Sequence, residues 1–97
     1  MSRVALIDDH ESVRLGLEAA CARDGAQTVV FSGSTVVSYL EWRSATSSQP
    51  ADVVVLDLTL GDGTTVTENV RSLVADGASV VILSLIHISE PTRLRRI

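Results

Sequence analysis

The amino-acid sequence predicts an α/β protein whose single domain is built on a doubly wound parallel sheet. Four short apolar runs have the length of buried strands and occupy residues 4–7, 28–31, 53–57 and 80–83. Amphipathic segments of helical length separate these runs. A regular alternation of strand and helix predicts right-handed crossovers, with helices on both faces of the sheet. The chain of 97 residues suits one domain.

The segments between the strands carry the apolar spacing and the end signals of helices. In the first and third segments, apolar residues recur at positions i, i+4, i+7 and i+8. Gly25 and Gly77 follow them where a left-handed C-cap would end each helix. Residues 32–34 offer an N-cap for the second helix. The residues expected to face the sheet are Val13, Leu17, Ala20 and Cys21, then Val36, Val37 and Leu40, then Val66, Val70, Leu73 and Val74.

Composition narrows the classes of function. All eight basic residues are arginines, and residues 1–83 hold five of them against eleven acids, a net charge of −6. Such an acidic body argues against nucleic acid as its own ligand, because phosphate backbones bind basic surfaces. The single cysteine, Cys21, excludes an intramolecular disulfide and a cysteine-cluster metal site. No apolar run approaches the ~20 residues that span a membrane, so we expect a cytoplasmic protein.

The last fourteen residues differ from the rest of the chain. Residues 84–97 hold three arginines against one acid, a net charge of +2. Residues 86–93 show neither a helical stripe nor a strand bounded by turns. We therefore expect residues 1–84 to form the domain and residues 85–97 to be a non-native or linker tail. This division predicts a parallel sheet that is truncated after the fourth strand.

Polar residues stand at the ends of three predicted strands. Asp8 and Asp9 follow the first strand, Asp57 ends the third, and Ser84 follows the fourth. In an open parallel sheet, ligands bind beyond the carboxyl ends of the strands. In the flavodoxin-like strand order these three strands are neighbours. We therefore expect the carboxylates of the first and third strands to converge on one pocket.

Three clustered carboxylates repel one another unless a cation neutralises them, and ligation by oxygen alone favours magnesium. Asp57 stands alone at the end of the central strand, which suits a nucleophile that forms an aspartyl phosphate. Asp8 and Asp9 suit metal binding. Each acid taken singly is better explained as a helix N-cap, but the set favours the metal site. His10 is expected to be a loop residue beside the N-cap, and Asp62 a turn residue between glycines.

Three motifs carry a resemblance to a known family. Residues 5–10 (ALIDDH), 54–58 (VVLDL) and 81–84 (VILS) resemble the receiver domain of two-component response regulators. The Asp-Asp-His opening followed by VRLGL is most similar to LuxR-type transcriptional regulators, and the match covers residues 3–84. The resemblance implies a CheY-like fold and Mg²⁺ bound by Asp8, Asp9, Asp57 and the backbone carbonyl of Thr59. It also implies that Asp57 is the phosphoacceptor and that Ser84 is the switch hydroxyl.

The same resemblance implies partners and a missing part. A sensor histidine kinase would supply the phosphoryl group, and a homodimer is an expected assembly. DNA would be contacted only through a C-terminal helix-turn-helix domain, which this sequence lacks, and no membrane is involved. The family carries a lysine after a fifth strand and an aromatic switch residue on that strand. This sequence has no lysine and nothing similar after Ser84, so we expect an incomplete receiver that does not switch.

Two other classes of function stay open at this point. A Mg²⁺-dependent phosphohydrolase with an aspartyl nucleophile would carry a second acid two residues after the nucleophile, where this chain has Thr59, and would need a lysine. A pseudo-receiver would act only in protein interaction, and the intact set of three acids argues against it. We expect no turnover enzyme, because a receiver at most loses its own phosphate slowly.

Overall fold

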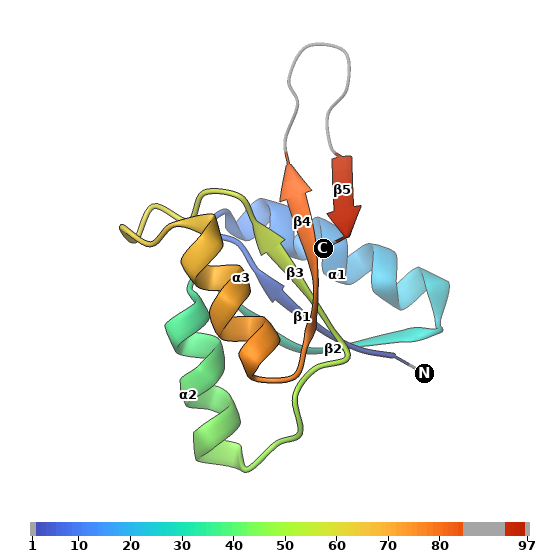
Figure 1. Ribbon diagram of the computed structural model, residues 1–97. Coiled ribbons are helices and arrows are strands. Elements are labelled where there is room, and N and C mark those ends of the chain that lie inside the picture. The colour runs from blue at the N-terminus through green and yellow to red at the C-terminus, as the bar shows by residue number, and fades with distance from the viewer. Residues whose placement is uncertain (1, 85–92, 97) are drawn as a thin grey trace.

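The computed structural model describes residues 2–84 and 93–96, which form one five-stranded sheet with helices on both faces (Figure 1). The strand order is β2-β1-β3-β4-β5; the first four strands are parallel and the last is antiparallel. The predicted alternation and the doubly wound parallel sheet are confirmed. The elements are β1 (Ser2–Ile7), α1 (Glu11–Asp24), β2 (Gln27–Gly33), α2 (Val36–Thr46), β3 (Val53–Asp57), α3 (Val66–Ala75), β4 (Ser79–Ser84) and β5 (Arg93–Arg96).

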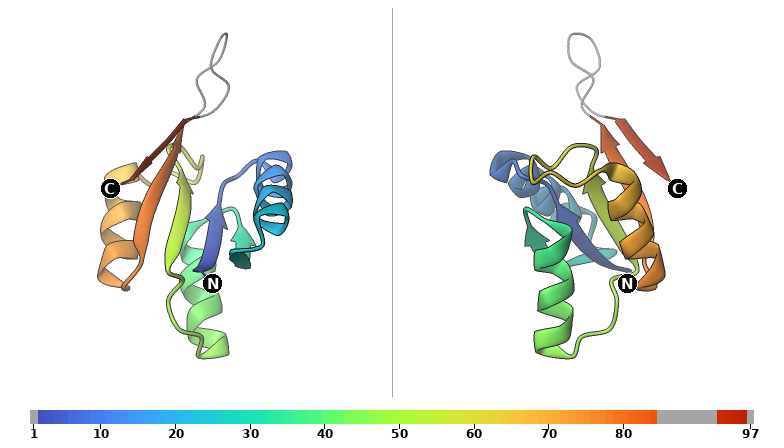
Figure 2. Two further views of the ribbon diagram at one scale, coloured as in Figure 1. Left: turned by 90° about the vertical axis from the view of Figure 1, so that its right-hand side faces the viewer. Right: turned by 60° about the vertical axis from the view of Figure 1, so that its left-hand side comes forward.

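The sheet separates two layers of helix. Helix α1 lies on one face, and α2 and α3 lie side by side on the other (Figure 2). The face toward α2 and α3 holds the main core, where Leu56 of β3 and Val80 of β4 are buried together with Tyr39 of α2 and Leu73 of α3. This packing follows from the alternation of side chains along each strand. It holds β1 and β3 firmly at the sheet centre, where the acidic residues emerge.

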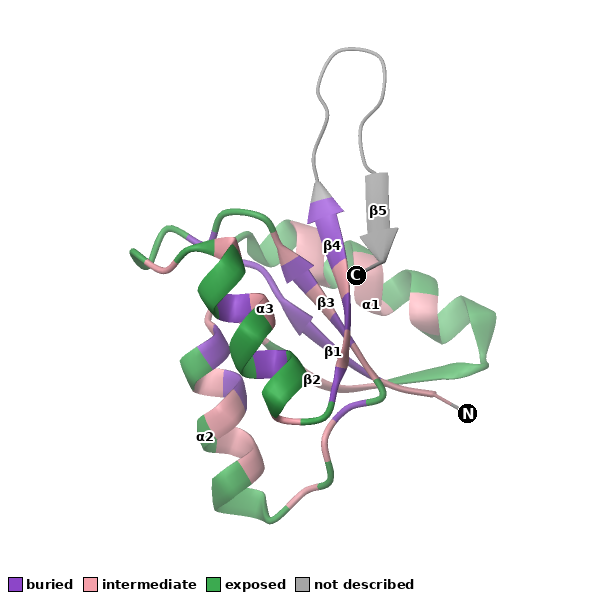
Figure 3. Ribbon diagram, in the orientation of Figure 1, coloured by how far each residue is buried: buried purple, intermediate pink, exposed green. Residues whose placement is uncertain are grey.

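Helix α1 covers its face of the sheet incompletely. No residue of α1 is buried, whereas α2 and α3 both bury side chains against the sheet (Figure 3). On the α1 face, Val53, Val55 and Val81 are half-buried and line a groove of about 410 Å³ with Leu17 and Cys21. The first apolar run, Val4–Ile7, is fully buried, whereas this part of β3 and β4 is only half-buried on the α1 face. Within the described residues, α1 is the one helix on this face, and a single helix is too small to cover several strands.

The helix ends largely match the local signals in the sequence. Gly25 ends α1 in the left-handed conformation, with φ 74°. Thr35 and Thr65 cap α2 and α3 by accepting hydrogen bonds from backbone N–H groups three residues on. The cap of α2 thus lies one residue beyond the expected segment, because β2 continues to Gly33. At the end of α3, Asp76 is the C-cap and Gly77 follows it.

Two residues expected to face the sheet point into solvent instead. Val37 is 57% exposed and Val74 is 53% exposed. In α2 the buried positions are Val36 and Tyr39, because residues three apart share a face whereas adjacent residues do not. Tyr39 also accepts a hydrogen bond from the Ala51 N–H at 2.9 Å, which fixes the entry to β3. No helix in the described ranges is long and apolar enough to cross a membrane.

Strand β5 was not expected from the sequence. Arg93–Arg96 pairs antiparallel with β4, from Ser84 opposite Arg93 to Val81 opposite Arg96. An open edge strand offers unpaired N–H and C=O groups to any extended segment, whatever that segment's side-chain pattern. Pro91 precedes this strand, so it does not interrupt the ladder. The expectation that residues 86–93 contain no strand residue is wrong at Arg93; residues 85–92 lie outside the described part of the chain.

Candidate metal and phosphoacceptor site

The register of the sheet brings the acidic residues together. Ile7 of β1 pairs with Leu56 of β3, so the next residues, Asp8 and Asp57, emerge side by side at the carboxyl ends of two neighbouring strands. The Asp8 N–H donates to the Gly33 carbonyl at 3.0 Å, which continues the β1–β2 ladder by one step. The predicted convergence of the first and third strand ends is therefore confirmed.

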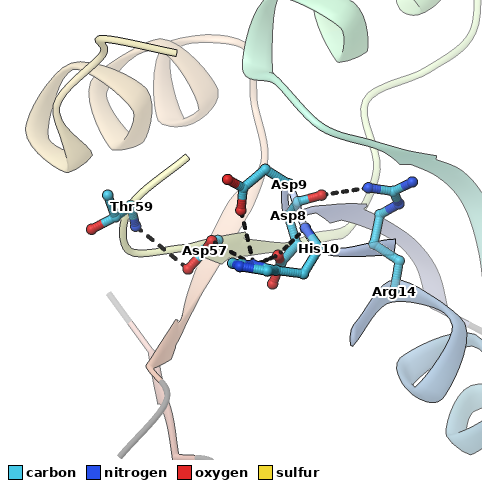
Figure 4. A network of polar contacts seen from close by, with 6 residues as sticks. All are labelled: Asp8, Asp9, His10, Arg14, Asp57 and Thr59. Carbon is cyan, nitrogen blue, oxygen red and sulfur yellow. Dashed lines mark hydrogen bonds and ion pairs between the residues drawn. The ribbon is translucent and has the colours of Figure 1, made fainter. Parts of the chain in front are cut away.

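Four side chains form one compact set of donor atoms (Figure 4). Asp8, Asp9, His10 and Asp57 each place one potential ligand atom within 4.8 Å of the others. Asp8 is 2% exposed, and the Asp57 side chain is 14% exposed, whereas Asp9 is more open to solvent. The cluster is thus reached from solvent on its Asp9 side and is closed on its Asp8 side.

Burial and the crowding of the carboxylates shift the pKa of Asp57 strongly. Desolvation, together with the negative charge of Asp8, raises the pKa of Asp57 to about 6, although a backbone hydrogen bond from Thr59 opposes the shift. That Thr59 N–H lies 3.4 Å from Asp57 Oδ1. The two effects that raise the pKa reflect negative charge confined where water screens it poorly. Bringing a cation into this set would relieve the repulsion.

The donor set fits a hard divalent cation. Three carboxylates supply oxygen atoms, which are the ligands that Mg²⁺ prefers. Asp8 is nearly fully buried, and the surroundings of Asp57 disfavour its ionised form. A positive ion would therefore be electrostatically favoured there. The structure brings Thr59 beside Asp57 through its N–H; the role of its carbonyl as a ligand stays a prediction.

His10 differs from the expectation of an uninvolved loop residue. It occupies the N-cap position of α1, but its side chain makes no capping hydrogen bond. Instead, Nδ1 lies 2.9 Å from Oδ1 of Asp8 and 2.9 Å from Oδ1 of Asp9, and 3.9 Å from Oδ2 of Asp57. The hydrogen bond with Asp8 and the charge of Asp9 raise the pKa of His10.

Two further residues support the cluster and were not singled out from the sequence. Arg14 Nη1 donates to the Asp8 carbonyl at 2.6 Å, so the first turn of α1 holds the end of β1. Gly61, with φ 77°, approaches the cluster so closely that a Cβ there would lie 3.1 Å from Oδ2 of Asp9. The glycine after Leu60 was visible in the sequence, but its partner across the loop was not.

The remaining predicted site residues divide into two groups. Asp62 is a turn residue as expected: its Oδ1 accepts from the Thr64 N–H at 3.0 Å and the Thr64 hydroxyl at 2.6 Å, which lowers its pKa. Ser84 ends β4, one residue beyond the Leu83 that pairs with Asp57. Its side chain lies outside the described part of the structure, so its role stays a prediction.

Comparison with solved structures decides the fold. The signal receiver domain of NarL from Mycobacterium tuberculosis superposes with a TM-score of 0.69 at 26% identity, over 91% of this chain and 69% of that one. The chain has the receiver-domain fold of response regulators. No protein-family model matches the sequence, and no curated protein matches it.

Two other receiver structures agree with this result. The receiver domain of the PhyR response regulator from Erythrobacter litoralis gives a TM-score of 0.66 at 20% identity, over 84% of this chain and 60% of that one. RcsB from Salmonella enterica serovar Typhimurium gives a TM-score of 0.68 at 20% identity, over 90% of this chain and 44% of that one. That structure was solved bound to promoter rprA in the presence of the phosphomimetic BeF₃⁻. The LuxR-type subgroup stays a prediction. This chain thus spans less than two thirds of the PhyR and RcsB chains.

Proposed function

We propose that this receiver fold is the phosphoacceptor module of a two-component response regulator, with Asp57 accepting a phosphoryl group from a sensor histidine kinase. One observation carries the proposal: Asp57 is a poorly solvated carboxylate beside two further acids, at the carboxyl end of the central strand. Its pKa of about 6 leaves it mainly ionised at neutral pH, and an ionised carboxylate is the nucleophilic form.

Each residue of the cluster has its own role in the proposed phosphoryl transfer. An Asp57 carboxylate oxygen attacks phosphorus, the P–N bond of the kinase phosphohistidine breaks, and an O–P bond forms in an acyl phosphate. The Thr59 N–H, 3.4 Å from Oδ1, orients the carboxylate. Asp8, Asp9, Asp57 and the Thr59 carbonyl would hold Mg²⁺, which would offset the negative charge that builds up as the phosphoryl group arrives. Arg14 keeps Asp8 in place through its carbonyl.

The wider role follows from the same proposal. In a receiver that also carries the fifth strand and its lysine, Ser84 would be the hydroxyl that responds to the phosphoryl group, and the output would be DNA binding through a helix-turn-helix domain outside this chain. The assembly would be a homodimer in the cytoplasm, and the protein would not be a turnover enzyme. A phosphohydrolase is disfavoured because exposed Thr59 stands where its second acid would be needed, and the structural neighbours are receiver domains.

Phosphorylation in vitro tests the proposal directly. Incubating the chain with Mg²⁺ and a small acyl-phosphate donor should add one phosphoryl group, seen by intact-mass spectrometry and removed by hydroxylamine, as an acyl phosphate must be. Asp57→Asn should abolish the modification, whereas Asp62→Asn in the adjoining loop should preserve it. A phosphoryl group that persists in Asp57→Asn would refute the assignment, and rapid release of free phosphate would indicate a phosphohydrolase.

A further inference from the structure

Among the four clustered donors, His10 is the one that a magnesium site does not need. A magnesium site uses oxygen ligands, yet the His10 ring faces three carboxylates from 2.9 to 3.9 Å away. We infer that His10 is a fourth side-chain ligand of this site, which therefore binds Ni²⁺ or Zn²⁺ more tightly than a site of carboxylates alone would. The inference rests on the proposed function, because it adds one ligand to the proposed metal site.

The spacing of the donor atoms matches the edges of one coordination sphere. With metal–ligand bonds of about 2.1 Å, adjacent octahedral ligands lie about 3.0 Å apart and opposite ligands about 4.2 Å apart. Nδ1 of His10 lies at the adjacent spacing from Asp8 Oδ1 and Asp9 Oδ1, both 2.9 Å, and near the opposite spacing from Asp57 Oδ2, 3.9 Å. All four donors stay within 4.8 Å of one another, so small side-chain rotations suffice to bring them around one ion.

The local backbone directs the ring toward the acids. The His10 N–H donates to Asp8 Oδ1 at 2.8 Å, which closes a tight turn between the two residues and returns the ring over the Asp8 carboxylate. The start of α1 fixes the position of His10, and its side chain is not used for capping. Because the ring is 58% exposed, its other nitrogen can carry the proton in water while Nδ1 binds a metal.

Ligand chemistry then sets the selectivity. Carboxylate oxygens suit Mg²⁺, whereas an imidazole nitrogen adds little for Mg²⁺ and much for the later transition metals. Removing even an outer-sphere partner lowers metal affinity by roughly 10- to 100-fold. Loss of the His10 nitrogen should therefore weaken Ni²⁺ binding strongly and leave Mg²⁺ binding nearly unchanged.

Calorimetry with the two metals separately tests the inference. The full 97-residue chain is prepared without an affinity tag, and with His87→Gln as the common background, so that His10 is the one imidazole left. His10→Gln should raise the Ni²⁺ dissociation constant by about tenfold or more and change that of Mg²⁺ by less than about threefold. Equal Ni²⁺ affinity with and without His10 would overturn the inference and identify the ring as a hydrogen-bond donor to Asp8 and Asp9.

A second measurement does not depend on the stability of the variant. In NMR spectra of the protein labelled with ¹⁵N-histidine, diamagnetic Zn²⁺ should shift the Nδ1 resonance of His10 much more than Mg²⁺ does. An unmoved resonance at saturating Zn²⁺ would overturn the inference.

The double variant Asp9→Ala/Asp57→Ala separates this inference from the proposed metal site, because it should abolish Mg²⁺ binding. If it does so while His10→Gln leaves Ni²⁺ affinity intact, only the His10 inference fails; if the double variant binds Mg²⁺ as well as the parent, the proposed metal site itself fails.

Discussion

The side chain of Asp57 is held in an electrostatically unfavourable place. It ends a central strand, where both neighbouring strands screen it from water, and Asp8 adds a like charge beside it. A carboxylate in such a place weakens the folded state of the metal-free chain when it ionises. This cost to stability is typical of functional sites, where reactivity is maintained by packing elsewhere. Here the core between the sheet and helices α2 and α3 supplies that packing.

The pH dependence of stability should reveal this cost. Folding raises the pKa of Asp57 from 3.8 to about 6, so the folded chain holds this proton more tightly than the unfolded chain does. The metal-free protein should therefore lose stability through this group as the pH rises from about 4 to about 6. Asp57→Asn should remove that loss and raise the free energy of unfolding near pH 7 by roughly 1 to 2 kcal/mol, after allowance for solvent screening.

Urea unfolding in the presence of a chelator, at about pH 4 and about pH 7, measures the effect. Asp62→Asn is the matched control, because hydrogen bonds from Thr64 lower the pKa of Asp62 and the substitution should not stabilise the chain. If Asp57→Asn is no more stable than the parent near neutral pH, the carboxylate is better solvated than its surroundings indicate.

At the scale of single elements, α1 is the least anchored helix. It buries no side chain, its N-cap residue His10 provides no side-chain hydrogen bond, and its interior contains Gly16. Besides half-buried side chains such as Leu17 and Cys21, the Arg14 contact at one end and the left-handed glycine cap at the other hold it in place. Because α1 begins at the acidic cluster, its stability bears directly on the positions of Asp8 and His10.

Two glycines in this helix should respond in opposite ways to alanine. Gly16 lies within the helix with nothing within 4 Å of an added Cβ, so Gly16→Ala should stabilise the chain by about 0.5–1 kcal/mol. Gly25 has φ 74°, so Gly25→Ala should destabilise it by about 1 kcal/mol. Thermal or urea unfolding of both variants checks the pair. A stabilising Gly25→Ala would mean that the end of α1 is frayed, and a destabilising Gly16→Ala would mean that the helix interior is packed more tightly than the structure shows.

At the scale of the whole molecule, the sheet is covered unevenly. One face packs against two helices, whereas the other carries α1 and a groove lined by half-buried valines. Strand β3 is paired on both sides, and β4 is paired on its outer side with β5 from Val81 to Ser84. The β5 ladder therefore protects the edge of the sheet nearest β3. Loss of the β5 ladder should therefore destabilise β4 more than β3.

Hydrogen exchange should follow this arrangement. Replacing Leu94 and Arg95 together by proline removes two adjacent N–H groups, of which one must point toward β4. Of the adjacent amides of Val81 and Ile82, the one directed toward β5 should then exchange about tenfold faster, equivalent to the loss of roughly one hydrogen bond. Amides of Val53–Asp57 serve as the internal control and should keep their protection. Unchanged exchange in β4 would mean that β5 contributes nothing to the edge.

The sequence by itself determined the alternation of elements, the parallel sheet and the place of the acids. These depend on local periodicity and on the rule that parallel strands end at a common edge, so Asp8 and Asp57 were predictable without long-range information. It also indicated the left-handed end of α1, because Gly25 is a local backbone signal.

Only the tertiary structure decided the contacts that join distant segments. The turn of His10 onto the carboxylates, the approach of Gly61 to Asp9 and the pairing of β5 with β4 have no periodic signature in the chain. The same is true of the exposed positions of Val37 and Val74, which an apolar pattern assigns to the core. Burial depends on what lies opposite a side chain, and a strand edge pairs through backbone groups that every residue carries.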